Sequence, residues 1–145
     1  MTRALTITSK PGLAAARRIL EAAQLPTEDL TEAHCEGFFF SGPAIAPTGL
    51  VGLELYGDVA LLRSLVVSSD HRGSGAGTAL LRHAEDHARS QGIRTLYLLT
   101  TTAEPFFVKH GYRRTARESA PAAIRATREF AGICPSSSAF MSRKL

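Results

Sequence analysis

The sequence predicts one mixed α/β (α+β) domain, and three features of the chain indicate it. Two runs of aliphatic and β-branched residues, Leu50–Tyr56 and Val59–Val67, flank the two-residue turn Gly57-Asp58, which is typical of a β-hairpin. A glycine-rich loop then leads into a helical pattern over Thr78–Gln91, and another strand-like run follows. A hairpin joined to a strand–helix–strand unit indicates mixed α/β or α+β topology, and 145 residues suit a single domain over 1–145.

Before the hairpin, the sequence patterns that predict helices and strands cover fewer residues. Thr2–Ile7 alternates weakly and predicts a strand, after which Ser9 can cap a helix that holds Pro11 in its first turn. The apolar residues of that helix recur at helical spacing: Leu13, Ala16, Ile19, Leu20 and Ala23. Thr27–Glu36 has room for one or two helical turns, and Phe38-Phe39-Phe40 predicts a strand.

After the loop, the helix over Thr78–Gln91 carries its apolar residues on one face and ends at Gly92. The run Thr95–Thr100 predicts a buried strand. The remaining elements expected are a short helix over Pro105–His110, a strand over Tyr112–Arg117, a helix over Pro121–Ile133 and a final strand over Ala139–Lys144.

The charge and hydropathy of the sequence restrict the classes of molecule that the protein is expected to bind. Seventeen Lys and Arg residues against thirteen Asp and Glu give a net charge of +4, spread mostly as single residues, which favours a small anionic ligand over nucleic acid. No apolar stretch approaches the roughly 18 residues of a membrane span, and no export signal is evident. We therefore expect no nucleic-acid or membrane partner and a cytoplasmic location. Cys35 and Cys134 are expected to be reduced thiols.

The glycine loop Arg72-Gly73-Ser74-Gly75-Ala76-Gly77 lies between a strand and a helix. Its backbone N–H groups and the helix N-terminus can bind an anion such as a pyrophosphate, and Arg72 can add a charged contact. The alternative is a glycine-rich connector without a ligand. A P-loop is excluded because no Lys-Ser/Thr pair follows, and the spacing differs from the dinucleotide-binding G-x-G-x-x-G pattern.

The motif Arg72-x-x-Gly75-x-Gly77, preceded by Leu65-Val66-Val67 and followed by an amphipathic helix, resembles the acyl-CoA loop of the GNAT N-acetyltransferases. The segment Ala103–Tyr112 is similar to the short helix and Gly-aromatic pair that follow the fifth strand in that family. The resemblance covers nearly the whole chain. It implies a GNAT fold, with a central mixed, mostly antiparallel, twisted sheet that is flanked by helices and splayed between its fourth and fifth strands.

The same resemblance implies acetyl-CoA as cosubstrate, no metal, and a homodimer as a common assembly. The residues expected to contact acetyl-CoA are Leu65, Val66, Val67, Arg72, Gly73, Ser74, Gly75, Ala76, Gly77, Thr78 and Phe107. Phe107 takes the place where the family usually has a tyrosine that protonates the leaving thiolate. Because a thiol has a pKa of about 8.5, the thiolate can leave with little help. His110 and Tyr112 are the candidate replacement acids.

A closer resemblance is to the GNAT subgroup associated with arsenic-resistance gene clusters. It rests on Glu54 with Ala60–Leu65, on Leu96–Ala103, on Pro121-x-x-Ile124-x-x-Thr127-x-Glu129-Phe130, and on Cys134-Pro135. It implies N-acetylation of an amino-acid-like toxin such as arsinothricin or phosphinothricin.

The hairpin supplies candidates for the acceptor side of the reaction. A two-residue turn pairs Gly52 with Arg63 and Glu54 with Leu61, so Glu54 and Arg63 are diagonal neighbours on one face. One hypothesis makes Glu54 the catalytic base and Arg63 the group that binds an acceptor anion. The other is a cross-strand ion pair with no further role. Glu129 is a second acidic candidate for substrate binding, or else an exposed helix charge.

The remaining polar residues give weaker signals. His83 and His87 lie four residues apart on the helix after the loop, but their spacing is not that of zinc proteases, and a solvated pair is expected. The sequence thus predicts an acetyl-CoA-dependent N-acetyltransferase acting on the amine of a small, anionic, amino-acid-like acceptor. The competing hypothesis is a non-catalytic module that binds acetyl-CoA as a sensor or partner, which Phe107 would suit.

Overall fold

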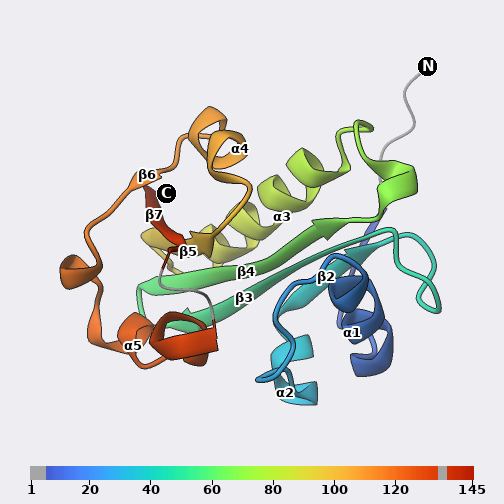
Figure 1. Ribbon diagram of the computed structural model, residues 1–145, viewed down its shortest axis with the longest axis horizontal. Helices are drawn as coiled ribbons and strands as arrows, with labels where there is room; N and C mark the ends of the chain where they lie inside the picture. Colours follow the sequence, from blue (N-terminus) through green and yellow to red (C-terminus); the bar gives the residue numbers. More distant parts are fainter. Residues whose placement is uncertain (1–5, 134–136) are drawn as a thin grey trace.

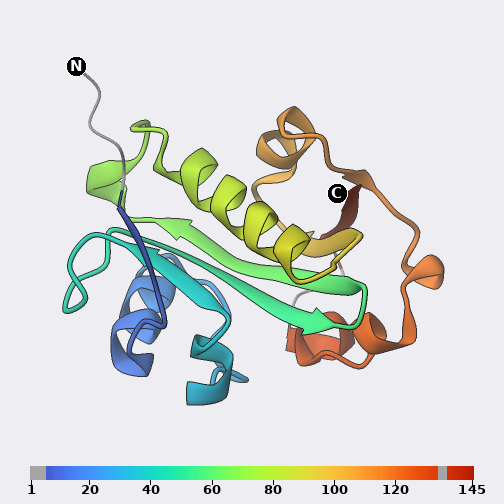
Figure 2. The same cartoon turned by 180° about the vertical axis from the view of Figure 1, so that it is seen from behind.

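The computed structural model describes residues 6–133 and 137–145 as a seven-stranded sheet with helices on both faces (Figures 1 and 2). The strands are β1 (Ile7–Ser9), β2 (Phe38–Ser41), β3 (Gly49–Tyr56), β4 (Val59–Val67), β5 (Thr95–Thr100), β6 (Arg113–Arg114) and β7 (Ala139–Lys144). The helices are α1 (Leu13–Ala22), α2 (Glu32–Cys35), α3 (Ala76–Ser90), α4 (Glu104–Lys109) and α5 (Ala122–Arg125). The spatial order is β1-β2-β3-β4-β5-β7-β6, and each neighbouring pair is antiparallel except β4 with β5. This is the mixed, mostly antiparallel sheet that the sequence predicts.

The alternation of side chains along β2 builds both faces of the sheet. Phe39 packs in the same apolar cluster as the buried side of α3, whereas Phe38 and Phe40 pack with α1. Successive residues of a strand point to opposite faces, so a run of three phenylalanines serves both layers. In the two views α3 lies on one side of the sheet, and α1 and α2 lie on the other (Figures 1 and 2).

The predicted hairpin is confirmed in its register. Glu54 lies opposite Leu61, and Gly52 lies opposite Arg63. Glu54 and Arg63 are therefore on one face of the sheet, as the two-residue turn requires.

Beyond this point β4 contains a β-bulge that the sequence did not reveal. Between the pairs Gly52–Arg63 and Leu50–Val66, β3 advances by two residues and β4 by three. The additional residue is accommodated at Ser64, which has a φ of 61°, a left-handed conformation that is rare for a residue with a side chain. One extra residue moves each of the side chains that follow to the opposite face of the sheet. Val66 therefore packs with α1.

The strands β4 and β5 separate soon after they begin. Their parallel pairing covers only Val59–Leu61 and Thr95–Tyr97. The rest of β4, residues 62–67, has no partner on that side within β5, and the two strands diverge. The splay between the fourth and fifth strands is thus confirmed, and it opens the cleft described below.

The first helix begins later than the sequence indicates. Ser9 was expected to cap it but lies in β1, and the Lys10 N–H donates to the Phe38 carbonyl at 2.9 Å, so extended pairing continues past the expected cap. Gly12 precedes the helix and provides no side-chain cap. Of the strand expected over Thr2–Ile7, residues 2–5 lie outside the described residues.

The helix predicted over Pro121–Ile133 is broken, and only α5 is α-helical within it. Thr127 Oγ1 donates to the Ile124 carbonyl at 2.7 Å and accepts the Phe130 N–H at 3.3 Å. A hydroxyl that binds nearby backbone groups competes with the helical ladder, which accounts for the break. The strand predicted over Tyr112–Arg117 is likewise reduced to β6, two residues that pair with β7 at the sheet edge.

The structure describes the surroundings of His83, His87 and Cys35, three of the side chains noted in the sequence. His83 and His87 are half-buried, because both rings pack edge-on against Phe39 with centroid distances of 4.7 and 5.0 Å. The Cys35 thiol is free and buried, and burial raises its pKa. Cys134 lies outside the described residues.

Within residues 6–133 and 137–145, no helix combines the length and the apolar character that a membrane span requires.

Candidate active site

A groove of three adjoining cavities runs along the split between β4 and β5. The loop cavity, at the glycine loop, has a volume of about 340 Å³, the middle cavity about 400 Å³ and the far cavity about 550 Å³. Val67 and Gly77 line both the loop and the middle cavities, and Leu65 and Thr102 line both the middle and the far cavities. The shared walls make one elongated site of the size that a long, thin ligand would need.

The loop cavity is built to receive an anion. Gly75 has a φ of 84° and directly precedes α3, so the first N–H groups of that helix, which have no partner one turn earlier, point out of its end. A Cβ at Gly73 or Gly75 would meet no atom within 4 Å, so the space in front of these N–H groups is open. Arg72 lines the same cavity and is exposed.

Gly77 marks the passage from the loop cavity to the middle cavity. A Cβ there would lie 3.7 Å from the Phe106 ring and 3.8 Å from Val67 Cγ2. A side chain at this position would reach Phe106 and Val67, so a glycine leaves room for a thin chain to pass between them. The open loop end and the narrow passage fit an anionic head joined to a thin chain, which is the shape of coenzyme A.

Arg63 projects from β4 at the far cavity, and its charge is enclosed by three carboxylates. Its Nη1 donates to Asp29 Oδ2 at 2.6 Å and to Glu54 Oε2 at 2.8 Å. Its Nη2 donates to Asp29 Oδ1 at 2.9 Å and lies 3.0 Å from Glu129 Oε1, and its Nε donates to Ser64 Oγ at 3.1 Å. A guanidinium has five N–H donors, so each of them is matched by an oxygen of the chain itself.

This arrangement changes the expected role of Arg63. Its side chain is 0% exposed, and that of Asp29 is 4% exposed. No N–H donor of Arg63 is left over for an acceptor anion while these bonds are in place. We therefore regard Arg63 as a residue that positions Asp29, Glu54 and Glu129 rather than as a residue that binds the acceptor.

The ion pairs also fix the protonation of the cluster. Burial by itself would raise the pKa of Asp29, but the hydrogen bonds and charge of Arg63 outweigh it and lower that pKa below its ordinary value. Burial would lower the pKa of Arg63, but Asp29, Glu129 and Glu54 hold it above its ordinary value. Asp29 is thus held as a carboxylate and Arg63 as a cation.

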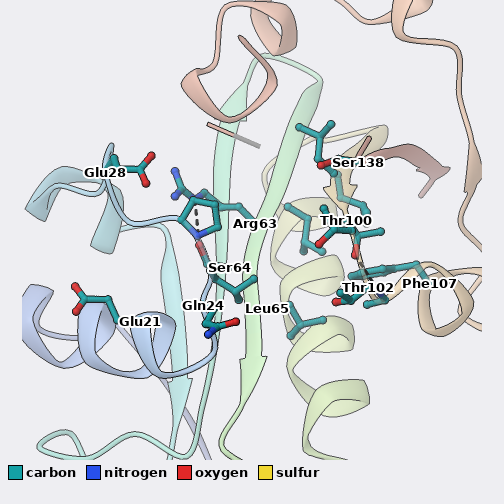
Figure 3. A pocket seen from close by; sticks show the side chains of 17 residues that line it. Glu21, Gln24, Glu28, Arg63, Ser64, Leu65, Thr100, Thr102, Phe107 and Ser138 are labelled. Carbon is teal, nitrogen blue, oxygen red and sulfur yellow. Dashed lines mark hydrogen bonds between the residues drawn. The ribbon is translucent and has the colours of Figure 1, made fainter. Parts of the chain in front are cut away.

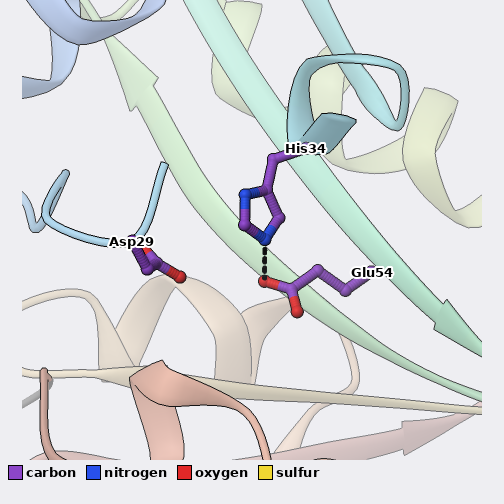
Figure 4. A group of neighbouring side chains, drawn as sticks. All are labelled: Asp29, His34 and Glu54. Atoms are coloured by element: carbon purple, nitrogen blue, oxygen red, sulfur yellow. Dashed lines mark ion pairs between the residues drawn. The ribbon is translucent and has the colours of Figure 1, made fainter. Parts of the chain in front are cut away.

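Glu54 is held by several groups at once. Its Oε1 accepts the Tyr56 hydroxyl, its Oε2 accepts Arg63, and His34 Nε2 lies 3.8 Å from Oε2 (Figure 4). Burial, followed by the Glu54 carboxylate, raises the pKa of Tyr56 above its ordinary value, so this phenol keeps its proton. Glu54 does not line the groove itself, and Arg63 lies between it and the far cavity.

The same cluster contains a geometrically plausible metal set. Ligand atoms of Asp29, His34 and Glu54 lie within 4.8 Å of one another, and Figure 4 shows the three side chains together. However, the Arg63 guanidinium already donates hydrogen bonds to the carboxylates of Asp29 and Glu54. The positive charge that balances these carboxylates therefore comes from the protein itself.

Phe107 lines the far cavity from α4. The two candidate replacement acids, Tyr112 and His110, form hydrogen bonds elsewhere. The Tyr112 hydroxyl donates to buried Glu85 at 2.9 Å, and burial together with the Glu85 charge raises its pKa, while His110 contacts the Phe106 carbonyl and Thr78 Oγ1. Neither residue lines any of the three cavities within the described chain.

The structure distributes the predicted site residues among the cavities. The loop cavity is lined by Val67, Arg72, Gly73, Gly75, Ala76, Gly77 and Thr78, and the middle cavity by Leu65, Val66, Val67, Arg72 and Gly77. The far cavity is lined by Arg63, Leu65 and Phe107 but not by Glu54 or Glu129, both of which form ion pairs with Arg63. Ser74 is not part of the lining of these cavities among the described residues, and its Oγ donates to the His71 carbonyl at 2.6 Å.

Sequence reasoning missed two walls of the far cavity. One is the end of α1 with the following segment, which contributes Glu21, Gln24 and Glu28; the other is Ser138 (Figure 3). Asp29 was missed as well, although a buried arginine requires carboxylate partners and could have prompted a search for more of them.

Comparison with known proteins gives the relationships of the chain. Residues 15–112 match the model of the acetyltransferase (GNAT) family. An amino-acid acetyltransferase from Ectopseudomonas mendocina is 32% identical over 107 residues, which are 74% of this chain and 23% of that protein. An amino-acid acetyltransferase from Ralstonia nicotianae is 34% identical over 86 residues, which are 59% of this chain and 18% of that protein. The chain thus spans about a quarter or less of the length of these relatives.

Solved structures share the fold. N-acetylglutamate synthase from Neisseria gonorrhoeae, complexed with coenzyme A and N-acetyl-glutamate, superposes with a TM-score of 0.81 at 22% identity over 100% of this chain and 36% of that one. An acetyltransferase of the GNAT family from Staphylococcus aureus superposes with a TM-score of 0.75 at 18% identity, covering 98% of this chain and 99% of that one.

Proposed function

The chain belongs to the acetyltransferase (GNAT) family, and on that basis we propose that it is an acetyl-CoA-dependent N-acetyltransferase that acts on the amine of a small amino-acid-like acceptor. The observation that carries the proposal is the continuity of the groove. It leads from the N–H groups at the start of α3, along the unpaired edge of β4, to a polar cavity beside Arg63.

The loop end would hold the pyrophosphate of acetyl-CoA. Residues 73–78 offer backbone N–H groups at a helix N-terminus and Arg72 a positive charge, both of which favour a phosphate. The middle cavity, with Val67, Gly77 and Phe106, would hold the thin apolar part of the molecule. When bound, acetyl-CoA supplies the activated acetyl group.

The split between β4 and β5 would position the reacting atoms. The main chain of Leu65 and Val66, free of β5, can donate to the thioester carbonyl oxygen, which gains negative charge as the amine attacks. The nitrogen–carbon bond forms, the carbon–sulfur bond breaks, and sulfur leaves as a thiolate. The amine loses one proton, and we assign its removal to Glu54 acting through water, because Glu54 lies behind Arg63 and not in the cavity wall.

The amino-acid character of the acceptor is supported by the relatives, which are named amino-acid acetyltransferases. The finer proposal is an anionic acceptor of the arsinothricin or phosphinothricin type, and it rests on the segments that resemble the arsenic-resistance subgroup. Arg63 does not supply the anion contact in this proposal, since its five donors are matched within the chain.

The test is turnover by the purified chain. Acetyl-CoA is mixed with a panel of amino acids, phosphinothricin and simple amines, release of the CoA thiol is followed, and the mass of the acetylated product is determined. We expect thiol release with amino acids above the rate without acceptor. If acetyl-CoA binds tightly but no amine is acetylated, the chain is instead the non-catalytic acetyl-CoA module that Phe107 would suit.

A further inference from the structure

Ser138 has a buried hydroxyl that forms no hydrogen bond to the residues that the structure describes. It directly precedes β7, and its carbonyl accepts a hydrogen bond from Arg117 Nη2 at 2.8 Å, which fixes the backbone at this position. The residue is 6% exposed, and within the described chain its Oγ has no hydrogen-bond partner. Buried hydroxyls are nearly always hydrogen-bonded, because an unpaired one loses its bonds to water without replacement.

This hydroxyl lies in the wall of the far cavity. Figure 3 shows Ser138 on the wall that faces Arg63 across the cavity, above Thr100. Ser138 lines neither the middle cavity nor the loop cavity, whereas Leu65 lines both the middle and the far one. Since the amine must react near the split at Leu65, Ser138 is placed to contact the end of the acceptor that does not react.

The charged residues that the structure describes around the far cavity offer no hydrogen-bond donor for the carboxylate of an acceptor, so a neutral donor would have to bind it. Arg63 is the one cationic side chain among the described residues of its lining, and its N–H donors are already matched. Glu21 and Glu28 are the other charged residues there, and both are acidic. A carboxylate in this cavity therefore depends on uncharged donors, of which Ser138 is the buried one without a partner.

We propose that Ser138 Oγ donates a hydrogen bond to the carboxylate of the acceptor and so selects amino acids over amines that lack this group. The inference rests on the proposed function, because it assumes that an amine acceptor enters the far cavity. It makes Ser138 an acceptor-binding residue and leaves acetyl-CoA binding to the other end of the groove.

The experiment compares Ser138→Ala with the wild type on two acceptors: the amino acid that the wild type acetylates fastest, and the amine formed by removing its carboxylate. The matched control is Ser137→Ala, which deletes the same hydroxyl from the exposed neighbouring residue. For Ser138→Ala we expect KM for the amino acid to rise at least about tenfold, as when a hydrogen bond to a charged group is lost. The kinetics with the amine should change less than about twofold, and Ser137→Ala should behave as the wild type.

A purely structural role would give a different pattern. Because Ser138 Oγ makes no hydrogen bond to any described residue, Ser138→Ala should not lower the melting temperature, and its KM for acetyl-CoA should be unchanged. Equal kinetics with both acceptors before and after the substitution would overturn the inference and leave the proposed function intact. No turnover by the wild type with any amine would overturn the proposed function itself, and this inference with it.

Discussion

Arg63 and Asp29 are joined by two parallel hydrogen bonds, from Nη1 to Oδ2 at 2.6 Å and from Nη2 to Oδ1 at 2.9 Å. The two residues are 34 positions apart in the chain. The pair fastens the segment that follows α1 to the middle of β4, and it does so with both side chains removed from water. The far cavity lies directly beside this attachment, so the shape of the cavity depends on it.

Removing the Arg63 side chain should lower the free energy of unfolding. Arg63→Ala removes the guanidinium that pairs with Asp29, Glu54 and Glu129, and breaking a buried ion pair in this way typically costs about 3–5 kcal/mol. Urea unfolding measures the loss. The control is Arg89→Ala, which removes the exposed pair with Asp86 and should cost at most about 1 kcal/mol. Equal stability of the two variants would contradict the role given to Arg63.

Asp29 should make the stability depend on pH in the acid range. Arg63 lowers the pKa of Asp29 in the folded protein, so the unfolded chain binds the proton more readily. The stability that this carboxylate contributes is present above its unfolded pKa of about 3.9 and is lost as the pH falls through the folded pKa. The free energy of unfolding should therefore fall less steeply below about pH 4 in Asp29→Asn than in the wild type. Parallel curves from urea titrations across this range would show that Asp29 does not act in this way.

Phe107→Tyr should raise kcat if departure of the thiolate limits the rate. The substitution returns a hydroxyl to the wall of the far cavity, where the resemblance places a general acid. The KM for acetyl-CoA should change little, because Phe107 lines neither the loop nor the middle cavity. Thiol-release kinetics decide the matter: an equal or lower kcat in a folded variant would mean that the step is not limiting.

Glu54→Gln should lower kcat and flatten the increase of the rate with pH, because the amide cannot accept the proton that a carboxylate accepts. The amide keeps an oxygen for Arg63, so the fold should survive. Glu36→Gln is the control, an exposed carboxylate away from the groove. An unchanged pH–rate profile in Glu54→Gln would remove Glu54 from the reaction.

Those parts of the fold that depend on local sequence were predictable. The turn Gly57-Asp58 determines the register that puts Glu54 and Arg63 on one face, and the final strand over Ala139–Lys144 was placed correctly. The bulge at Ser64 was not predictable, because a left-handed serine within a strand leaves no mark in the alternation of apolar residues around it.

The acceptor side of the site depends on distant contacts, which one sequence does not reveal. Asp29 lies in a polar stretch that looks like a surface loop, and only the folded chain brings it to Arg63. Ser138 follows the predicted helix that proved to be broken, so its position beside the far cavity could not be inferred. By contrast, Gly73 and Gly75 were identified because the geometry that an anion requires is encoded within a few consecutive residues.

The central claim is that the groove binds acetyl-CoA through the glycine loop, and calorimetric titration of acetyl-CoA tests it most directly. Gly75→Glu puts a side chain and a negative charge into the open loop cavity, and Gly92→Glu makes the same change at the other end of α3, where the glycine has nearly the same φ, 82° against 84°. The backbone strain is thus matched, and only the position differs. We predict that Gly75→Glu weakens binding at least about tenfold, or about 1.4 kcal/mol, while Gly92→Glu binds as the wild type does. Undiminished binding by a folded Gly75→Glu variant would contradict the account.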